Sequence, residues 1–169
     1  MDVTNIITPI SEDTVASLKV GDVVNISGNI YCGRDAVLPR ICHEIENGTW
    51  DLRGIDLKGS VIFHTAVSPA GVGPTSSNKL EIESSFAILS KAGVKMHLGK
   101  GAIDKKTIEY LREFNSVFTI IPPVTALLES HTMERECIAF HELGMEALYR
   151  IKVKDYQAIV AAAQGKSIY

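Results

Sequence analysis

The sequence has few cysteines, and their spacing follows no recognisable pattern. Cys32, Cys42 and Cys137 are the only three in 169 residues. An odd number of widely spaced cysteines indicates neither a disulfide framework nor the ligand set of a zinc or iron–sulfur site. We therefore expect this chain itself to hold no metal, so that any metal must come from elsewhere. The five histidines are equally dispersed, and we expect each to be a surface or packed residue rather than a ligand.

Long apolar runs and an excess of positive charge are also lacking. No apolar run approaches the roughly 20 residues that a membrane helix requires, and residues 1–4 lack the basic and apolar regions of a signal peptide. The net charge of −3 gives no electrostatic footprint for nucleic acid or an anionic membrane. These absences predict a soluble cytoplasmic protein with no nucleic-acid or membrane partner. The 46% apolar content suits one domain, residues 1–169, with a core of its own.

Strand signals dominate the first third of the chain, and strands alternate with short helices after residue 50. Strands are expected at residues 23–31, 61–63, 94–98, 116–121, 136–140 and 147–153. Helices are expected at residues 11–18, 39–47, 82–89, 104–111, 123–128 and 155–162, the last one capped by Asp155. Gly28 indicates a bulge or a tight hairpin. The pattern predicts a single α/β domain with a mixed sheet and flanking helices.

The central stretch, Gly71–Glu81, is expected to be the turn that joins the strand at 61–63 to the following helix. Its glycines allow a tight turn, and its hydroxyl side chains lie where the first unpaired N–H groups of the helix point outward. That geometry favours an anion pocket. The alternative is a simple helix cap, because Asn78 and Glu81 have the spacing of a capping box.

Cations also follow several of the expected strands. Lys79 and Lys100 follow consecutive strands, and open α/β sheets bind their ligands at the carboxyl ends of strands. Arg34 follows the strand at 23–31 and has the chemistry to clamp a carboxylate through two parallel hydrogen bonds. The alternative for Arg34 is a surface pair with its neighbour Asp35.

A series of short motifs in a distinctive order connects the chain to a known family. The motifs are Lys19-Val20-Gly21-Asp22, Arg34-Asp35-Ala36, Leu57-Lys58-Gly59, Val72-Gly73-Pro74-Thr75, Gly99-Lys100-Gly101 and Glu142-Leu143-Gly144-Met145-Glu146-Ala147. From about Leu18 to Tyr169 the chain resembles the β subunit, equivalent to the C-terminal domain, of iron–sulfur hydro-lyases. These enzymes are the class I fumarate hydratases and the L(+)-tartrate dehydratases.

The resemblance implies a swivelling β/β/α fold and a hetero-oligomer whose α subunit carries the [4Fe-4S] cluster on its own cysteines. It implies reversible dehydration of a small hydroxy-dicarboxylate of the fumarate/malate or tartrate type, at a site between the two parts. The matching positions imply Arg34, Thr75, Lys79 and Lys100 as ligands of the dicarboxylate. They imply Ser76, Thr75 and Lys79 as catalytic residues.

The chemistry explains why such residue types are needed. Removing a proton from a carbon beside a carboxylate places negative charge on that carboxylate in the transition state, where fixed cations such as Arg34, Lys79 and Lys100 can stabilise it. A hydroxyl is a poor base, so Ser76 can serve only if the cations favour its alkoxide or relay its proton.

The chain departs from the family pattern at several positions. Leu38 replaces a usual histidine, Ser76 a threonine, Lys79 an arginine and Glu81 an aspartate, and residues 122–125 replace a stretch of small residues. If Leu38 lines the pocket at a partly exposed position, a histidine there should cost little stability. Two alternatives to the dicarboxylate hydro-lyase follow: a divergent hydro-lyase with another substrate, and a non-catalytic dicarboxylate-binding relative.

Overall fold

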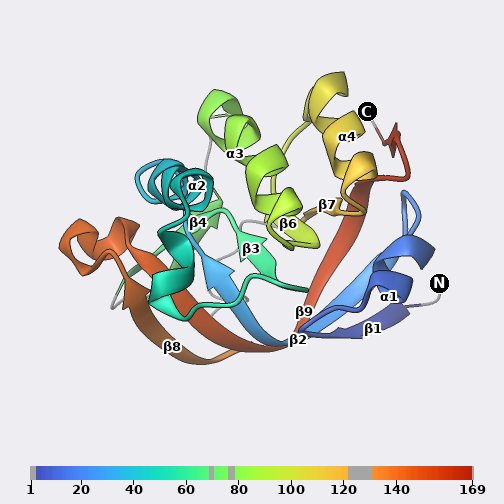
Figure 1. Ribbon diagram of the computed structural model, residues 1–169. Helices are drawn as coiled ribbons and strands as arrows, with labels where there is room; N and C mark the ends of the chain where they lie inside the picture. Colours follow the sequence, from blue (N-terminus) through green and yellow to red (C-terminus); the bar gives the residue numbers. More distant parts are fainter. Residues whose placement is uncertain (1–2, 69–70, 76–78, 122–130, 169) are drawn as a thin grey trace.

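A computed structural model describes residues 3–68, 71–75, 79–121 and 131–168 of the chain (Figure 1). The strands are β1 Val3–Ile7, β2 Val23–Cys32, β3 Val61–Phe63, β4 Thr65–Ser68, β5 Gly71–Thr75, β6 Met96–Gly99, β7 Val117–Ile120, β8 Thr132–Ala139, β9 Leu148–Ala163 and β10 Lys166–Ser167. The α-helices are α1 Glu12–Ser17, α2 Leu38–Asn47, α3 Lys79–Lys91 and α4 Lys105–Glu113, and the 3-10 helices are η1 Trp50–Arg53 and η2 His141–Glu146.

The main sheet is mixed and closes on itself. Its strand order is β1-β2-β3-β6-β7-β9-β10, with β8 beside β9 and a further pairing between β2 and β9. Neighbours from β1 to β7 in this order run parallel, whereas β9 runs antiparallel to both β7 and β2. The strands β2, β3, β6, β7 and β9 therefore form a closed ring. The mixed-sheet α/β fold expected from the sequence is confirmed, and the swivelling arrangement implied by the resemblance stays a prediction.

Helices α2, α3 and α4 lie side by side over the sheet (Figure 1). One core cluster fills the space among the strands and includes Ile26, Ile30, Met96 and Val160. Two further clusters lie between the helices and the sheet, one around Leu38, Ile41, Ile62 and Leu89 and the other around Phe86, Leu111 and Phe118. Within the described residues, no helix combines the length and apolar character needed to traverse a bilayer.

Local sequence signals correctly predicted several helix boundaries. The Ser11 hydroxyl accepts a hydrogen bond from the Thr14 N–H, and the Asp104 carboxylate accepts one from the Thr107 N–H at 2.8 Å. Both contacts satisfy a helix-terminal donor that would otherwise be unpaired. Gly48 ends α2 in the left-handed conformation, and the β2–β9 register shifts beside Gly28, which confirms the expected bulge.

The helix expected at residues 155–162 is wrong, because β9 continues without interruption to Ala163. From Ile151 to Val160 its side chains alternate between buried and exposed, with one break at Asp155, which is the period of a strand. Asp155 adopts a φ of 53°, and its N–H donates to the Ser27 hydroxyl at 3.0 Å. Asp155 therefore lies in a bulge of β9 and does not cap a helix, and long-range pairing outweighs the local helix signal.

The expectation for the central stretch also needs correction. Residues 71–75 do not form a turn but form strand β5, which pairs with β4 in a separate antiparallel hairpin. Only then does α3 begin, at Lys79. The expected cap Asn78 and the helix expected at 123–128 lie outside the described residues.

Leu38 is a core residue, so the idea that it lines the pocket at a partly exposed position is wrong. Its side chain is 1% exposed and belongs to the same core cluster as Val37 and Ile41. Leu38 is the first residue of α2, and the face it occupies packs onto the sheet. The departure from the family histidine at this position is therefore a packing change.

We predict that Leu38→His lowers the free energy of unfolding by about 2–5 kcal/mol, because it replaces packed methyl groups with a buried polar ring. Leu38→Met, which conserves volume and apolar character, should cost less than about 1.5 kcal/mol. Urea denaturation of the two variants and the parent measures both effects. A loss below about 1 kcal/mol for Leu38→His would restore the partly exposed position expected from the sequence.

Candidate functional site

Parallel strands bring the sequence-predicted cations to one edge of the sheet. Strands β2, β3 and β6 are parallel neighbours, with Cys32 opposite Phe63 and Phe63 opposite Leu98. Arg34 and Lys100 therefore leave the sheet at the same edge, close to the ends of β2 and β6. Ligands bind at the carboxyl ends of parallel strands both in open α/β sheets and in closed barrels.

The backbone around Arg34 is held at this edge by hydrogen bonds on both sides. The Gly33 N–H donates to the Phe63 carbonyl at 3.0 Å, and the Arg34 carbonyl accepts from Leu38 N–H at 2.9 Å. Gly33 is required here because a Cβ atom at its position would lie 2.6 Å from a methyl group of Val37. The strand-to-helix turn thus fixes where the Arg34 side chain begins.

The Arg34 guanidinium pairs with the carboxylate of Glu146, the last residue of η2. Arg34 Nε lies 3.0 Å from both Glu146 carboxylate oxygens, and Nη2 lies 2.6 Å from Oε1. The hydrogen bonds to Glu146 raise the pKa of Arg34. The sequence favours a substrate carboxylate or Asp35 as the partner of Arg34, and it contains no signal that indicates Glu146. The register Cys32 opposite Tyr149 explains the contact, because it sets the end of β2 beside the segment that precedes β9.

The structure describes the other predicted site residues, which are Lys100, Thr75, Lys79 and Ser76, to different extents. Lys100 is exposed directly after β6, and Gly101 follows it with a φ of 75° that favours glycine. Thr75 ends β5 opposite Thr65, and Lys79 opens α3; for these two the structure describes the backbone alone. Ser76 lies outside the described residues. The roles of Thr75, Ser76 and Lys79 stay predictions.

A buried histidine pair lies beneath this edge. His64 follows β3 directly, and its Nε2 is 3.3 Å from Nδ1 of His97 on β6. The other nitrogen of His97 is 2.9 Å from the Ser90 hydroxyl, and Phe86 stacks on the His97 ring with centroids 4.2 Å apart. Both imidazoles are fully buried, which confirms for these two the expectation of packed histidines. Nδ1 of His64 has no hydrogen-bond partner among the described residues.

Burial keeps both histidines neutral. Desolvation lowers the pKa of His64 to about 3. Desolvation, and secondarily the electrostatic influence of His64, lowers the pKa of His97 well below its usual value. A neutral pair allows one ring to donate and the other to accept across the 3.3 Å contact.

The cysteines do not fit an iron–sulfur cluster. Cys32 lies on β2, Cys42 on α2 and Cys137 on β8. Burial raises the pKa of the Cys32 thiol strongly and that of Cys42 to about 11, whereas cluster ligands are thiolates. Among the described residues, no three His, Cys, Asp or Glu side chains are grouped in a way that could hold a metal ion.

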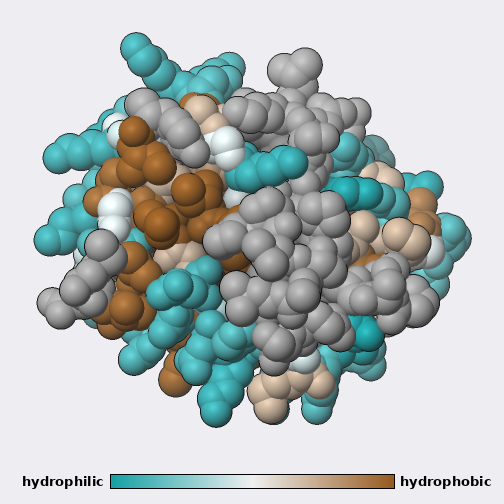
Figure 2. Space-filling model, turned by 180° about the vertical axis from the view of Figure 1, so that it is seen from behind, coloured by the Kyte–Doolittle hydropathy of each residue, from teal (hydrophilic) through white to brown (hydrophobic). Residues whose placement is uncertain are grey.

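Apolar side chains are also exposed on the surface. Figure 2 shows a hydrophobic area on the rear face, bordered in part by hydrophilic side chains. The large hydrophobic residues that are exposed in the described part of the chain are Val3, Ile7, Leu52, Met133, Met145, Ile159 and Ile168. Met145 precedes Glu146 on η2, so one of these side chains is next to the Arg34 contact.

Sequence comparisons point to one family. The family model described as the fumarase C-terminus matches residues 2–169. A protein of Geobacillus stearothermophilus named for class I fumarate hydratase is 31% identical over 95% of this chain, which spans only 32% of that protein. The L(+)-tartrate dehydratase β subunit of Escherichia coli K12 is 29% identical over 92% of the chain and 80% of the subunit. A Methanocaldococcus jannaschii protein named for the same subunit is 27% identical over 95% of the chain and 88% of its own length.

The buried histidines predict a fall in stability on mild acidification. The folded-state pKa of His64 is about 3, below the 6.5 of an unfolded histidine, so only the unfolded chain takes up the proton between these values. The contribution of neutral His64 to the free energy of unfolding is present above pH 6.5 and is lost as the pH falls. From His64 alone, the loss between pH 7 and pH 5 is about 2 kcal/mol.

His64→Gln should remove that part of the pH dependence, and urea denaturation at pH 5, 6 and 7 measures it. The carboxyls of Glu12, Glu44 and Asp104 have lowered pKa values as well, yet their ordinary values of 4.5 and 3.8 place their effect below this range. Equal slopes for parent and variant would show that His64 is not held neutral in the folded state.

Proposed function

Because this chain belongs to the fumarase C-terminus family, we propose that it is the β-type part of a hydro-lyase. Its substrate is a small hydroxy-dicarboxylate of the fumarate/malate or tartrate type, which it dehydrates reversibly. One observation carries the proposal: the parallel strands β2 and β6 bring Arg34 and Lys100 to a single sheet edge. Two cations at one edge suit a ligand with a carboxylate at each end.

The side chains at this edge suit the charge that dehydration creates. Loss of a proton beside a carboxylate moves negative charge onto that carboxylate, and a fixed cation stabilises the transition state more than the ground state. In the proposal Arg34, Lys100, Lys79 and Thr75 hold the substrate. Ser76, with Thr75 and Lys79, transfers the proton, for which a nearby cation must favour its alkoxide.

An α subunit completes the site in this proposal and carries the [4Fe-4S] cluster. The cysteines of this chain are poorly suited to ligate a cluster, which supports this arrangement. They lie on different elements, and two of them are buried with raised pKa values. The relatives named as β subunits support a hetero-oligomer. Exposed Ile7, Leu52, Met133 and Met145 supply apolar surface of the kind that a partner covers.

Leu38 gives no support to the alternatives considered from the sequence. Its side chain is buried beneath α2, so it does not make the ligand-binding edge more apolar. The exposed Lys100 and the ordered Arg34 retain the charges that a dicarboxylate needs. The dicarboxylate hydro-lyase is therefore the proposed function.

We predict that the chain purified alone has no dehydratase activity, and that co-expression with an α subunit restores it. The chain is incubated anaerobically with iron and sulfide, and absorbance and iron content are recorded; neither should show a cluster. Malate, fumarate and tartrate turnover is then followed in the complex. A cluster with stoichiometric iron on the isolated chain would overturn the two-subunit arrangement.

A second prediction concerns Lys100. In the assembled complex, Lys100→Ala should lower kcat/KM by about 10- to 100-fold, the effect of losing one charge-assisted hydrogen bond. Lys105→Ala is the matched control, because Lys105 is also exposed but opens α4 rather than following β6. If both variants keep the activity of the parent, Lys100 is not a substrate ligand.

A further inference from the structure

The Arg34–Glu146 contact occupies only one edge of the guanidinium. Nε and Nη2 both contact the Glu146 carboxylate, so the carboxylate lies against the Nε–Nη2 edge. A planar guanidinium has a second edge, formed by Nη1 and the remaining N–H of Nη2, which can bind another carboxylate through two parallel hydrogen bonds. Among the described residues, Nη1 makes no hydrogen bond or ion pair.

Glu146 is well suited to act as a rigid anchor. It directly precedes Ala147 and Leu148, both of which are buried. The Ala147 N–H donates to the Gly144 carbonyl at 3.1 Å, and the Tyr149 hydroxyl donates to the same carbonyl at 3.2 Å. Strand β9 then pairs with β2, so the backbones of Glu146 and Arg34 are tied to adjacent strands. The carboxylate therefore has a defined position relative to the arginine.

We propose that Glu146 is a positioning residue that holds Arg34 with its Nη1–Nη2 edge presented to one carboxylate of the dicarboxylate. This inference rests on the proposed function and deepens it. The contact is half-buried, with 29% and 31% of the two side chains exposed, so solvent weakens it less than a surface pair. Because folding already orders the long arginine side chain, ligand binding does not have to order it.

The opposite role for Glu146 makes a different prediction. If its carboxylate competes with the ligand for the guanidinium, removing the charge frees Arg34 and tightens binding. If Glu146 positions Arg34, removing the charge releases the side chain and weakens binding. The direction of the change therefore decides between the two roles.

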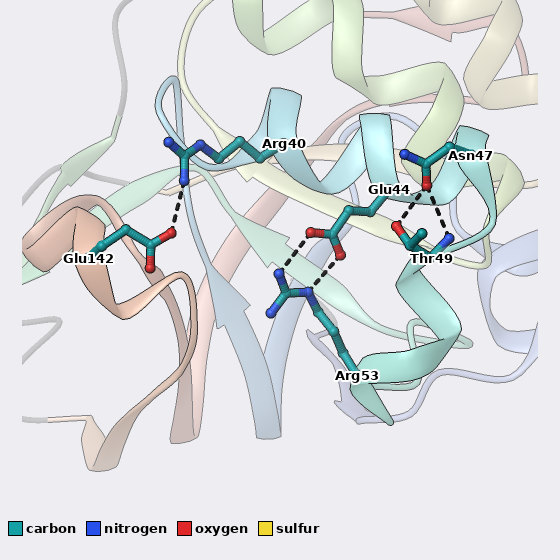
Figure 3. A network of polar contacts seen from close by, with 6 residues as sticks. All are labelled: Arg40, Glu44, Asn47, Thr49, Arg53 and Glu142. Atoms are coloured by element: carbon teal, nitrogen blue, oxygen red, sulfur yellow. Dashed lines mark hydrogen bonds and ion pairs between the residues drawn. The ribbon is translucent and has the colours of Figure 1, made fainter.

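The chain contains a matched control in the Arg40–Glu142 pair (Figure 3). Arg40 lies on α2 and Glu142 on η2, so this pair joins nearly the same two segments as Arg34 and Glu146. It has a contact of 2.9 Å and exposed side chains, 49% and 63%. Loss of this pair tests whether simply tethering η2 affects ligand binding.

The experiment uses the complex with the α subunit and two probes, L-malate for turnover and succinate, which has no hydroxyl to eliminate, for binding by calorimetry. Glu146→Gln keeps the size of the side chain but removes its charge. It should weaken succinate binding and lower kcat/KM by at least about 10-fold, because a misplaced ligand reacts slowly. Glu142→Gln should change both by less than about twofold, as expected for an exposed pair.

A double-mutant cycle separates positioning from general loss of structure. If Glu146 acts only through Arg34, adding Glu146→Gln to Arg34→Ala should have no further effect on succinate binding. Additive losses, tighter binding in Glu146→Gln, or an equal loss in Glu142→Gln would each overturn the inference. A parent complex that binds succinate but turns over no diacid would refute the proposed function alone. A parent that binds no diacid would overturn both.

Discussion

The antiparallel pairing of β9 with β2 is the constraint on which the rest of the structure depends. It closes the ring of strands around the apolar core and, although its register shifts once beside Gly28, it is the longest strand pairing in the sheet. The same pairing sets Tyr149 opposite Cys32, so the segment before β9 lies next to the segment after β2. Arg34 and Glu146, 112 residues apart, meet for that reason. The same strand pairing thus both closes the fold and arranges the candidate site.

Local signals predicted those parts of the fold that local physics determines. Ser11 and Asp104 cap helices because their side chains reach N–H groups three residues ahead, and such contacts can be read from sequence. The edge with Arg34 and Lys100 was predictable too, since parallel strands place their ends together. The end of β9 was not, because Asp155 followed by alanines has helical character locally, and only pairing with β2 and β7 makes it a strand.

The Glu146 contact shows that local sequence patterns do not reveal which distant residues meet. Glu146 was part of a motif shared with the family, yet a motif does not say which distant residue its carboxylate faces. That partner follows from strand register, which local patterns do not contain. Leu38 is the converse case. A departure from the family pattern suggested an altered pocket, but helix α2 buries the Leu38 side chain in the core. His64 and His97 likewise meet only because β3 and β6 are neighbours.

The charges at the site divide into two roles. The negative charge of Glu146 balances the positive charge of Arg34, so this pair orients a ligand more than it attracts one. A dicarboxylate carries two negative charges, and the chain as a whole is also negative at −3. Long-range attraction of such a ligand therefore has to come from cations that are not paired with a carboxylate as Arg34 is. In the described part of the chain, the exposed Lys100 lies where it can provide this attraction. Arginine supplies the planar fork that fixes orientation and lysine the mobile point charge, which is the division that their side-chain chemistry favours. Under the proposed function, Lys100 thus attracts the dicarboxylate and Arg34 aligns it.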